Sequence, residues 1–406
     1  MKKYILIILC CLTSFPLWSY NVNMIVEHYS VDQGLPNNTV NCTLKDRDGF
    51  IWFGTWYGLC CFDGVKFKTF NKQEHDSDVP PRKIQRIVED KNGYIWVKTI
   101  DRKLYVFNKV TECFHAVYDD MKNYSENIQV IKLQNTAEGD VLLLTKDKNL
   151  LLTGVDEKGQ VTIKILFDSR DEINKHDYTL KHHVLCETEE YISWIGTDYK
   201  VSAVHKGAEL ASRPADFITS KINSGDKDSF TSFFEDGRKV WVGDRAGIFY
   251  SIDVRTGLVN RYVLSEIKGA ISNLLVTPAG YVYLSVAGQG TYEYDLAERR
   301  LQKINTEMND AMVTHAFIDQ YDKIWFHENE KALIYYDPLN HTAKRFPFTM
   351  FGKITTLYSE DAGERGLFFL SPAGEAWLFD REHAEMVYIN KLKQLSNDRT
   401  NQQFYH

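Results

Sequence analysis

The residues best suited to contact a ligand are aromatic and charged side chains in turns that follow the second strand of a repeated four-strand pattern. Planar rings stack on sugar rings, while carboxylate, amide and guanidinium groups form hydrogen bonds with hydroxyl groups. Trp56 and Tyr57 lead this set because a solvated turn seldom needs two adjacent large rings. The full set of candidate ligand-binding residues is Trp56, Tyr57, Asp101, Arg102, Asp198, Tyr199, Asp244, Arg245, Gln289, His327 and Glu328. It predicts a carbohydrate site, although polar turns of a non-binding scaffold would have a similar composition.

The same residues give little indication of catalysis. A glycosidase needs two carboxylates about 5–10 Å apart, and a lyase needs a Tyr or His base beside a group that neutralises a carboxylate. The spacing singles out no such pair, and no phosphate loop, nucleotide fingerprint, hydrolase elbow or metal-spaced His set is present. We therefore expect a non-enzymatic protein with no cofactor and no metal. A propeller glycosidase or polysaccharide lyase stays open as an alternative.

A repeated aromatic strand positions these turns. The second strand of each repeat reads GFIWFGT at Trp52, GYIWVKT at Trp96, GDVLLLT at Leu142, YISWIGT at Trp194, KVWVGD at Trp241, GYVYLSV at Tyr283, DKIWFHE at Trp325 and RGLFFLS at Phe368. Four short strands per copy, at a period in the low to mid forties, predict an all-β fold: a β-propeller of seven or eight four-stranded antiparallel blades. The tryptophans should fill the space between neighbouring blades.

The first repeat shows the pattern most clearly. Strands are expected at Phe50–Thr55, Leu59–Phe62 and Val65–Phe70, with a tight turn at Asp63–Gly64. In a propeller, the turns between second and third strands gather with the connections between blades on one face. We therefore expect the candidate residues to form a ring on that face.

Three segments depart from the pattern. Asp168–Lys181 and Ala208–Lys227 are expected to be irregular connections, and Met24–Ser30 alternates like an outer strand without a blade of its own. Such an orphan strand suggests that the ring closes by completing a blade from the C-terminal side. The count of seven or eight blades stays open.

Composition excludes several classes of partner. The chain of 406 residues has a formal charge of −7 and no dense basic run, so nucleic acid and anionic membrane are poor candidates. Residues 1–19 read as a cleavable signal peptide, and nothing later resembles a transmembrane helix, so export to the periplasm is expected. The cysteines outside this leader are odd in number and irregularly spaced, and Cys42 and Cys60 should lie too far apart for a disulfide.

The first repeat resembles a known family. The runs Tyr29–Val40, Asp46–Thr55 and Gly58–Gly64 are similar to the two-component regulator propeller repeats. These repeats occur in the periplasmic sensor region of hybrid two-component system histidine kinases that control polysaccharide-use genes. Such sensors usually carry two seven-bladed propellers, a Tyr-rich β-sandwich, one membrane helix, and kinase and receiver domains. The resemblance implies that this chain is a sensory part of such a protein, without the kinase.

These observations lead to one predicted organisation. We expect a signal peptide (1–19), a seven-bladed propeller (20–348), an eighth repeat (349–390) and a polar tail (391–406). The eighth repeat is either an extra blade or the first blade of an incomplete second propeller. The expected partners are an oligosaccharide or a protein, with a homodimer through the propeller as a further option. The expected role is a non-catalytic sensor module, with a protein-interaction scaffold as the main alternative.

Overall fold

The structure is a computed structural model of the chain. It describes residues 29–70, 81–122, 129–146, 149–167, 185–187, 190–195, 200–207, 217–221, 230–304, 313–328, 331–351, 358–361, 366–371 and 375–391.

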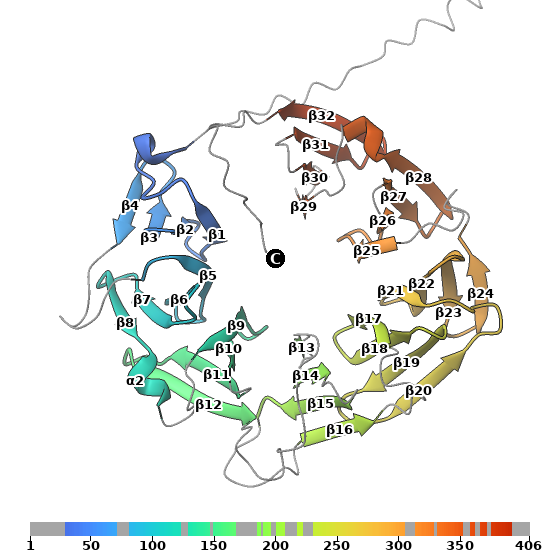
Figure 1. Ribbon diagram of the computed structural model, residues 1–406, viewed down its shortest axis with the longest axis horizontal. Helices are drawn as coiled ribbons and strands as arrows, with labels where there is room; N and C mark the ends of the chain where they lie inside the picture. Colours follow the sequence, from blue (N-terminus) through green and yellow to red (C-terminus); the bar gives the residue numbers. More distant parts are fainter. Residues whose placement is uncertain are drawn as a thin grey trace, which may run out of the picture. The chain divides into compact units, whose positions relative to one another are not determined.

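Strands dominate the described residues and form eight sheets of four strands each (Figure 1). In every sheet, strands that follow one another in sequence are neighbours, so each sheet is an antiparallel meander. We number these sheets as blades 1 to 8 in chain order. The prediction of an all-β propeller built from four-stranded antiparallel blades is confirmed.

The strand bounds follow the repeat. Blades 1 to 4 consist of β1 (Val40–Lys45), β2 (Ile51–Thr55), β3 (Gly58–Phe62), β4 (Phe67–Phe70), β5 (Ile84–Glu89), β6 (Ile95–Thr99), β7 (Leu104–Asn108), β8 (Cys113–Ala116), β9 (Val130–Asn135), β10 (Val141–Thr145), β11 (Leu150–Val155), β12 (Val161–Phe167), β13 (Leu185–Glu187), β14 (Tyr191–Ile195), β15 (Lys200–His205) and β16 (Phe217–Lys221). Blades 5 to 8 consist of β17 (Phe230–Glu235), β18 (Lys239–Asp244), β19 (Ile248–Asp253), β20 (Val259–Val263), β21 (Ile271–Val276), β22 (Tyr281–Val286), β23 (Gly290–Asp295), β24 (Arg300–Lys303), β25 (Val313–Ile318), β26 (Ile324–Glu328), β27 (Ala332–Asp337), β28 (Thr342–Pro347), β29 (Tyr358–Asp361), β30 (Leu367–Leu370), β31 (Glu375–Asp380) and β32 (Glu385–Lys391). Short helical turns are η1 (Val31–Gln33), α2 (Tyr118–Met121) and η5 (Phe348–Phe351).

A recurring hydrogen-bond pattern joins the first turn of a blade to the tryptophan of its second strand. In blade 1, Asp46 Oδ1 accepts bonds from the amides of Asp48 (3.0 Å) and Phe50 (2.9 Å), and Oδ2 accepts the Trp52 indole N–H at 2.8 Å. The same carboxylate–indole bond joins Asp90 to Trp96 (2.9 Å), Asp236 to Trp241 (2.7 Å) and Asp319 to Trp325 (3.4 Å). One carboxylate thus stabilises both a tight turn and an indole donor.

Two blades replace both partners of this bond together. Blade 6 has Thr277 and Tyr283 where blade 1 has Asp46 and Trp52, and the Thr277 hydroxyl accepts the Tyr281 amide at 3.2 Å. Blade 3 similarly has Thr136 and Leu142, and the Thr136 hydroxyl accepts the Asp140 amide at 3.1 Å. A hydroxyl can hold the turn, and no indole N–H is left without an acceptor.

Buried aromatic and aliphatic side chains join the first seven blades in succession. Trp52, Trp96, Trp241 and Trp325 are at most 3% exposed, as predicted for residues that fill the space within and between blades. Six apolar clusters each combine residues of two consecutive blades, represented by the pairs Trp52–Phe107, Trp96–Leu143, Leu142–Ile192, Ala203–Val240, Phe249–Ile271 and Leu275–Ile324. Figure 1 shows the first strand of these blades on the inside and the fourth on the outside.

The chain divides into two compact units. Residues 28–329 and 333–345 form one unit, and residues 330–332 and 346–399 group into the other. The second unit contains β29–β32 and η5, and its core includes an edge-to-face contact between Phe351 and Trp377, with ring centroids 4.9 Å apart. The division of the chain at residues 348 and 349, and the role of the eighth blade, stay predictions.

Local corrections have simple physical causes. The fourth strand of blade 1 begins at Phe67 rather than Val65, because Asp63 Oδ1 accepts the amides of Val65 and Lys66 and keeps them in the turn. The 208–227 segment is not wholly irregular, because it contains β16, paired with β15. The cysteine prediction is confirmed as far as the structure describes it: Cys42, Cys60, Cys61 and Cys113 are free thiols.

Several predicted features fall outside the described residues. These are the signal peptide, most of the orphan strand (24–28 of 24–30), the 168–181 connection and the polar tail beyond residue 391. Within the described part of the chain, no helix has both the length and the apolar character needed to cross a membrane.

Candidate functional site

The antiparallel meander gives each blade two distinct ends. We call one end the Trp56 edge: it carries the turns between second and third strands, beginning with Trp56–Tyr57 in blade 1, and the connections between blades. We call the opposite end the Asp46 edge: it carries the turns between first and second strands, such as Asp46–Gly49, and those between third and fourth strands. The sequence placed the ligand at the Trp56 edge.

The aromatic side chains of Trp56 and Tyr57, in the turn between β2 and β3, extend into solvent from a backbone that is fixed by hydrogen bonds. Trp56 is 38% exposed and Tyr57 is 60% exposed. The Thr55 hydroxyl donates to Gly58 O (2.8 Å) and accepts the Tyr57 amide (3.2 Å), and Gly58 closes the turn at φ 138°, which favours glycine. The rings are therefore presented on a fixed turn.

Lys83 joins this turn to blade 2. Its amide donates to Trp56 O at 2.9 Å, and its ammonium lies 5.4 Å from the centroid of a Trp56 ring. The amide of Ile100 then donates to Lys83 O at 2.9 Å. The connection that enters blade 2 thus lies between the second–third turns of blades 1 and 2.

Asp101 and Arg102 continue this row of residues along the Trp56 edge toward blade 3. We call the row formed by Lys83, Asp101, Arg102 and Gln129, beside Trp56, the belt. Both side chains are exposed. Burial alone would raise the pKa of Asp101, but the hydrogen bond from Thr99 (2.5 Å) and the charge of Lys103 hold it below its usual value, so it is ionised at neutral pH. Arg102 O accepts the Val130 amide at 3.0 Å, and its guanidinium reaches Gln129 Oε1 at 3.5 Å. Trp56, Lys83, Arg102 and Gln129 therefore follow one another along the Trp56 edge.

Asp244 and Glu328 have structural partners that the sequence did not reveal. Asp244 is 2% exposed, and its Oδ1 accepts the amides of Ala246 and Ile248, both at 2.9 Å. Glu328 is 4% exposed and accepts two bonds from Arg345, at 3.1 and 2.9 Å. Both carboxylates hold their own blade together.

The other candidates of blades 4 to 7 are dispersed. Arg245 is exposed beside Asp244, while the Gln289 side chain binds the connection between blades 5 and 6 by accepting the Lys268 amide (2.7 Å) and donating to Glu266 O (3.0 Å). His327 lies on β26 rather than in a turn, because pairing with His315 continues the strand. Burial and the nearby His315 lower the pKa of His327. Asp198 and Tyr199 lie outside the described residues.

Lys98 is a residue that sequence reasoning missed. In blades 1 and 5 the matching position is Gly54 or Gly243, where a Cβ atom would lie 2.4 Å from Cys42 Sγ or Ser232 Oγ. Blade 2 has a lysine here, and its ammonium donates to Gln85 Oε1 and Ile131 O, both at 2.8 Å. Burial, with Arg102 and Arg86 nearby, lowers the pKa of Lys98 to about 8. The sequence signal for Lys98 is the replacement of the repeat's glycine by lysine at this position of the second strand.

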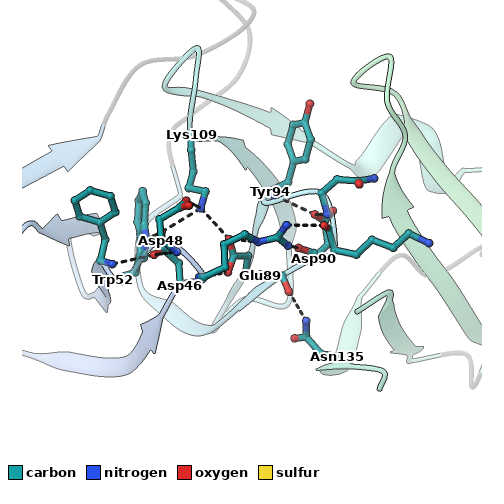
Figure 2. A network of polar contacts seen from close by, with 12 residues as sticks. Asp46, Asp48, Trp52, Glu89, Asp90, Tyr94, Lys109 and Asn135 are labelled. Atoms are coloured by element: carbon teal, nitrogen blue, oxygen red, sulfur yellow. Dashed lines mark hydrogen bonds and ion pairs between the residues drawn. The ribbon is translucent and has the colours of Figure 1, made fainter. Parts of the chain in front are cut away.

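At the Asp46 edge, three carboxylates converge on one lysine (Figure 2). Oxygens of Asp46, Asp48 and Glu89 lie within 4.8 Å of one another, a spacing that could suit a cation. The Lys109 ammonium occupies this space, at 3.1 Å from Asp46 and 2.8 Å from both Asp48 and Glu89. Burial alone would lower the pKa of Lys109, but these bonds raise it, so the chain itself places a cation among the three carboxylates.

The matched part of blade 1 identifies the repeat. Residues 34–57 match a family model described as "Two component regulator propeller". This segment is therefore similar to a two-component regulator propeller repeat. The matched segment includes the Asp46–Trp52 bond and ends at Tyr57, so this propeller repeat contains both the structural carboxylate and the exposed aromatic pair.

Solved structures resemble this propeller at low sequence identity. The extracellular domain of BT4673 from B. thetaiotaomicron, described as a hybrid two component system, is 13% identical, with a TM-score of 0.40 over 90% of this chain and 62% of that chain. The corresponding domain of BT3049 from the same organism is 15% identical, with a TM-score of 0.36 over 91% of this chain and 55% of that chain. The Dos1 propeller is 14% identical, with a TM-score of 0.49 over 84% of this chain and 90% of that chain.

The chain therefore spans less than two thirds of the length of these two extracellular domains. No curated protein sequence matches it.

Proposed function

We propose that this chain is the ligand-sensing propeller module of a hybrid two-component regulator and that it recognises an oligosaccharide from polysaccharide breakdown. The propeller repeat at residues 34–57 supports the regulatory role. The observation that carries the ligand class is the exposed Trp56–Tyr57 pair on a rigid turn. Two adjacent rings offer stacking surfaces, and the belt beside them supplies hydrogen-bonding groups for hydroxyls.

The belt has the polar groups that such a site needs. Asp101 is an ionised acceptor, Arg102 and Lys83 are cationic donors, and Gln129 offers both kinds of group. Of the candidate carboxylates that the structure describes at this edge besides Asp101, Asp244 and Glu328 are buried and engaged in structural bonds. The module is therefore proposed to bind sugar without cleaving it.

Signal transmission would need further domains. Binding that favours one placement of the propeller over another would bias a dimer of the whole receptor, because a ligand shifts an equilibrium by its difference in affinity for the two states. The protein is proposed to be periplasmic after removal of residues 1–19, with residues 20–348 and 349–390 as its two folded parts. N-terminal sequencing of the exported protein tests the cleavage site, and cell fractionation tests the compartment.

The function is tested by calorimetric titration of the purified protein with plant and host oligosaccharides, followed by product analysis of each mixture. Saturable binding with unchanged sugar is expected for one class of oligosaccharide, and Trp56→Ala should weaken it at least tenfold. The matched control is Tyr118→Ala, which removes a ring that is 57% exposed on α2. Cleaved sugar would refute the non-catalytic role, and no binding by folded protein would favour a protein-interaction scaffold.

A further inference from the structure

A cavity of about 720 Å³ lies at the Asp46 edge, between blades 1 and 2. Its lining comes from the first–second and third–fourth turns of both blades and from residues of β2, β3, β4 and β7. The volume falls in the range of about 300–1,000 Å³ that is typical of small-molecule sites. This cavity lies at the opposite end of the blades from the Trp56–Tyr57 turn, so it is separate from the proposed sugar site.

The cavity has an apolar lining on both of its sides. Phe50 of blade 1 is 42% exposed and Val110 of blade 2 is 92% exposed, and both line it. Deeper in blade 1, Trp52 and Phe70 stack with ring centroids 5.4 Å apart. The indole N–H of Trp52 is already donated to Asp46, so this part of the lining presents ring surface rather than an open donor.

The carboxylates that line the cavity are already engaged. Asp48 accepts a bond from Lys109 at 2.8 Å, and Glu112 pairs with Lys68. Asp63 accepts the amides of Val65 (2.9 Å) and Lys66 (2.8 Å). These bonds leave the anionic groups of the lining with partners inside the protein.

The cationic groups of the lining are engaged in the same way, with one exception. Arg47 donates to the carbonyl oxygens of Lys91 (2.6 Å) and Asp90 and lies 3.2 Å from Glu89. Lys66 is exposed, lines the cavity and forms no ion pair with any described residue. The charge of Lys66 helps to lower the pKa of nearby Asp63, so the cavity combines an apolar lining with one positive charge that has no ion-pair partner among the described residues.

We propose that this cavity binds a small organic monoanion with a flat apolar body, such as an aryl carboxylate or sulfonate, whose charge lies at Lys66. The apolar body packs against Phe50 and Val110, which would otherwise stay in water. A cationic ligand of the same shape is repelled by Lys66. A neutral one keeps the packing but lacks the ion pair, so it binds more weakly.

The test uses three naphthalene probes of nearly equal size: 2-naphthoate, 2-naphthamide and 2-naphthylmethylammonium. Each is titrated against the full-length protein by competition with the fluorescent anion 8-anilinonaphthalene-1-sulfonate. An ion pair in a partly exposed site is worth about 1 kcal/mol, so naphthoate should bind about fivefold more tightly than naphthamide. The ammonium compound should bind most weakly.

Three variants separate the charge from the apolar surface. Lys66→Gln should abolish the preference for naphthoate and leave naphthamide affinity unchanged. Phe50→Ala should weaken the binding of naphthoate and naphthamide by a similar factor, because both pack against this ring. The turn itself should persist, because the hydrogen bond from the amide of residue 50 to Asp46 does not depend on the side chain. The control is Lys158→Gln, which removes an exposed lysine from the matching turn of blade 3 and should change neither affinity.

Thiol labelling locates the ligand. Cys61 lines the cavity, and burial raises the pKa of its thiol to about 11, so maleimide labelling is followed at alkaline pH by peptide mass analysis. Naphthoate should slow the labelling of Cys61 and leave that of Cys113, which does not line the cavity, unchanged. Equal affinity for all three probes, an unaltered preference in Lys66→Gln, or no protection of Cys61 would each overturn the proposal. None of these results depends on sugar binding at Trp56.

Discussion

The two edges of the blades use the same residue types for different purposes. At the Asp46 edge, an aspartate of blades 1, 2, 5 and 7 accepts the indole N–H of its own blade, so the side chains repeat because the turn and the tryptophan both need them. At the Trp56 edge, corresponding positions differ from blade to blade. Where the fold does not require a particular side chain, the residue at that position is free to serve ligand recognition.

The contrast between Asp90 and Asp101 gives the largest expected effect. Asp90 is 1% exposed and accepts bonds from Asn92, Tyr94, Trp96 and, across the blade interface, Val155 at 3.2 Å. Asp90→Ala leaves several buried donors without an acceptor and should lower the free energy of unfolding by about 3–4 kcal/mol. Asp101→Ala should change it by less than about 0.5 kcal/mol. Urea unfolding of both variants measures the difference, and equal losses would show that the edges do not differ in this way.

Lys109 tests whether the acidic cluster depends on its internal cation. Lys109→Ala leaves the carboxylates of Asp46, Asp48 and Glu89 close together with Arg47, 3.2 Å from Glu89, as the remaining counter-charge, and should cost about 1–3 kcal/mol. Calcium prefers several carboxylate oxygens, so millimolar Ca²⁺ should raise the melting temperature of this variant. Wild-type protein and Lys158→Ala should not respond. A response of equal size in all three proteins would argue against a vacated cation position.

The lowered pKa of Lys98, on the second strand of blade 2, gives a prediction about how stability depends on pH. Its pKa is lowered from 10.5 to about 8, so between these values the unfolded chain binds more protons than the folded chain. The free energy of unfolding should therefore rise with pH across this window, by up to about 3 kcal/mol from this group. Lys98→Met should remove that part of the slope. Unfolding curves at pH 7.5, 9 and 10.5 give the comparison, and identical slopes would contradict the assigned pKa.

Trp56 should have the smallest effect on stability. Its ring is exposed and its backbone bond to Lys83 survives substitution, so Trp56→Ala should change the free energy of unfolding by less than about 0.5 kcal/mol. A large loss in urea unfolding would mean that the ring is structural, like Trp52 and Trp96.

Sequence reasoning succeeded where the pattern is local. The aromatic second strands, the four-strand meander and the burial of Trp52 and Trp96 follow from periodicity and residue type alone. It could not separate Asp244 from Asp101, because the same residue type either accepts amides of its own turn or faces solvent. The belt partners Lys83 and Gln129 were missed, because their positions depend on backbone bonds between blades.

The cavity shows the same limit more strongly. Phe50 and Val110 belong to turns of different blades, and each taken alone reads as an isolated exposed apolar residue. Only the packing of blades 1 and 2 brings these two residues to one site. Only the ion pairs of the neighbouring side chains show that Lys66 has no ion-pair partner there among the described residues.

The most direct test of the proposed role is calorimetric titration of the wild-type protein, Trp56→Ala and Tyr118→Ala with the oligosaccharide that gives the largest saturable heat in the panel. We expect equal affinity for wild type and Tyr118→Ala, a loss of at least tenfold for Trp56→Ala, and recovery of unchanged sugar. Equal affinity for all three proteins would mean that Trp56 does not contact the sugar and would refute the proposed site.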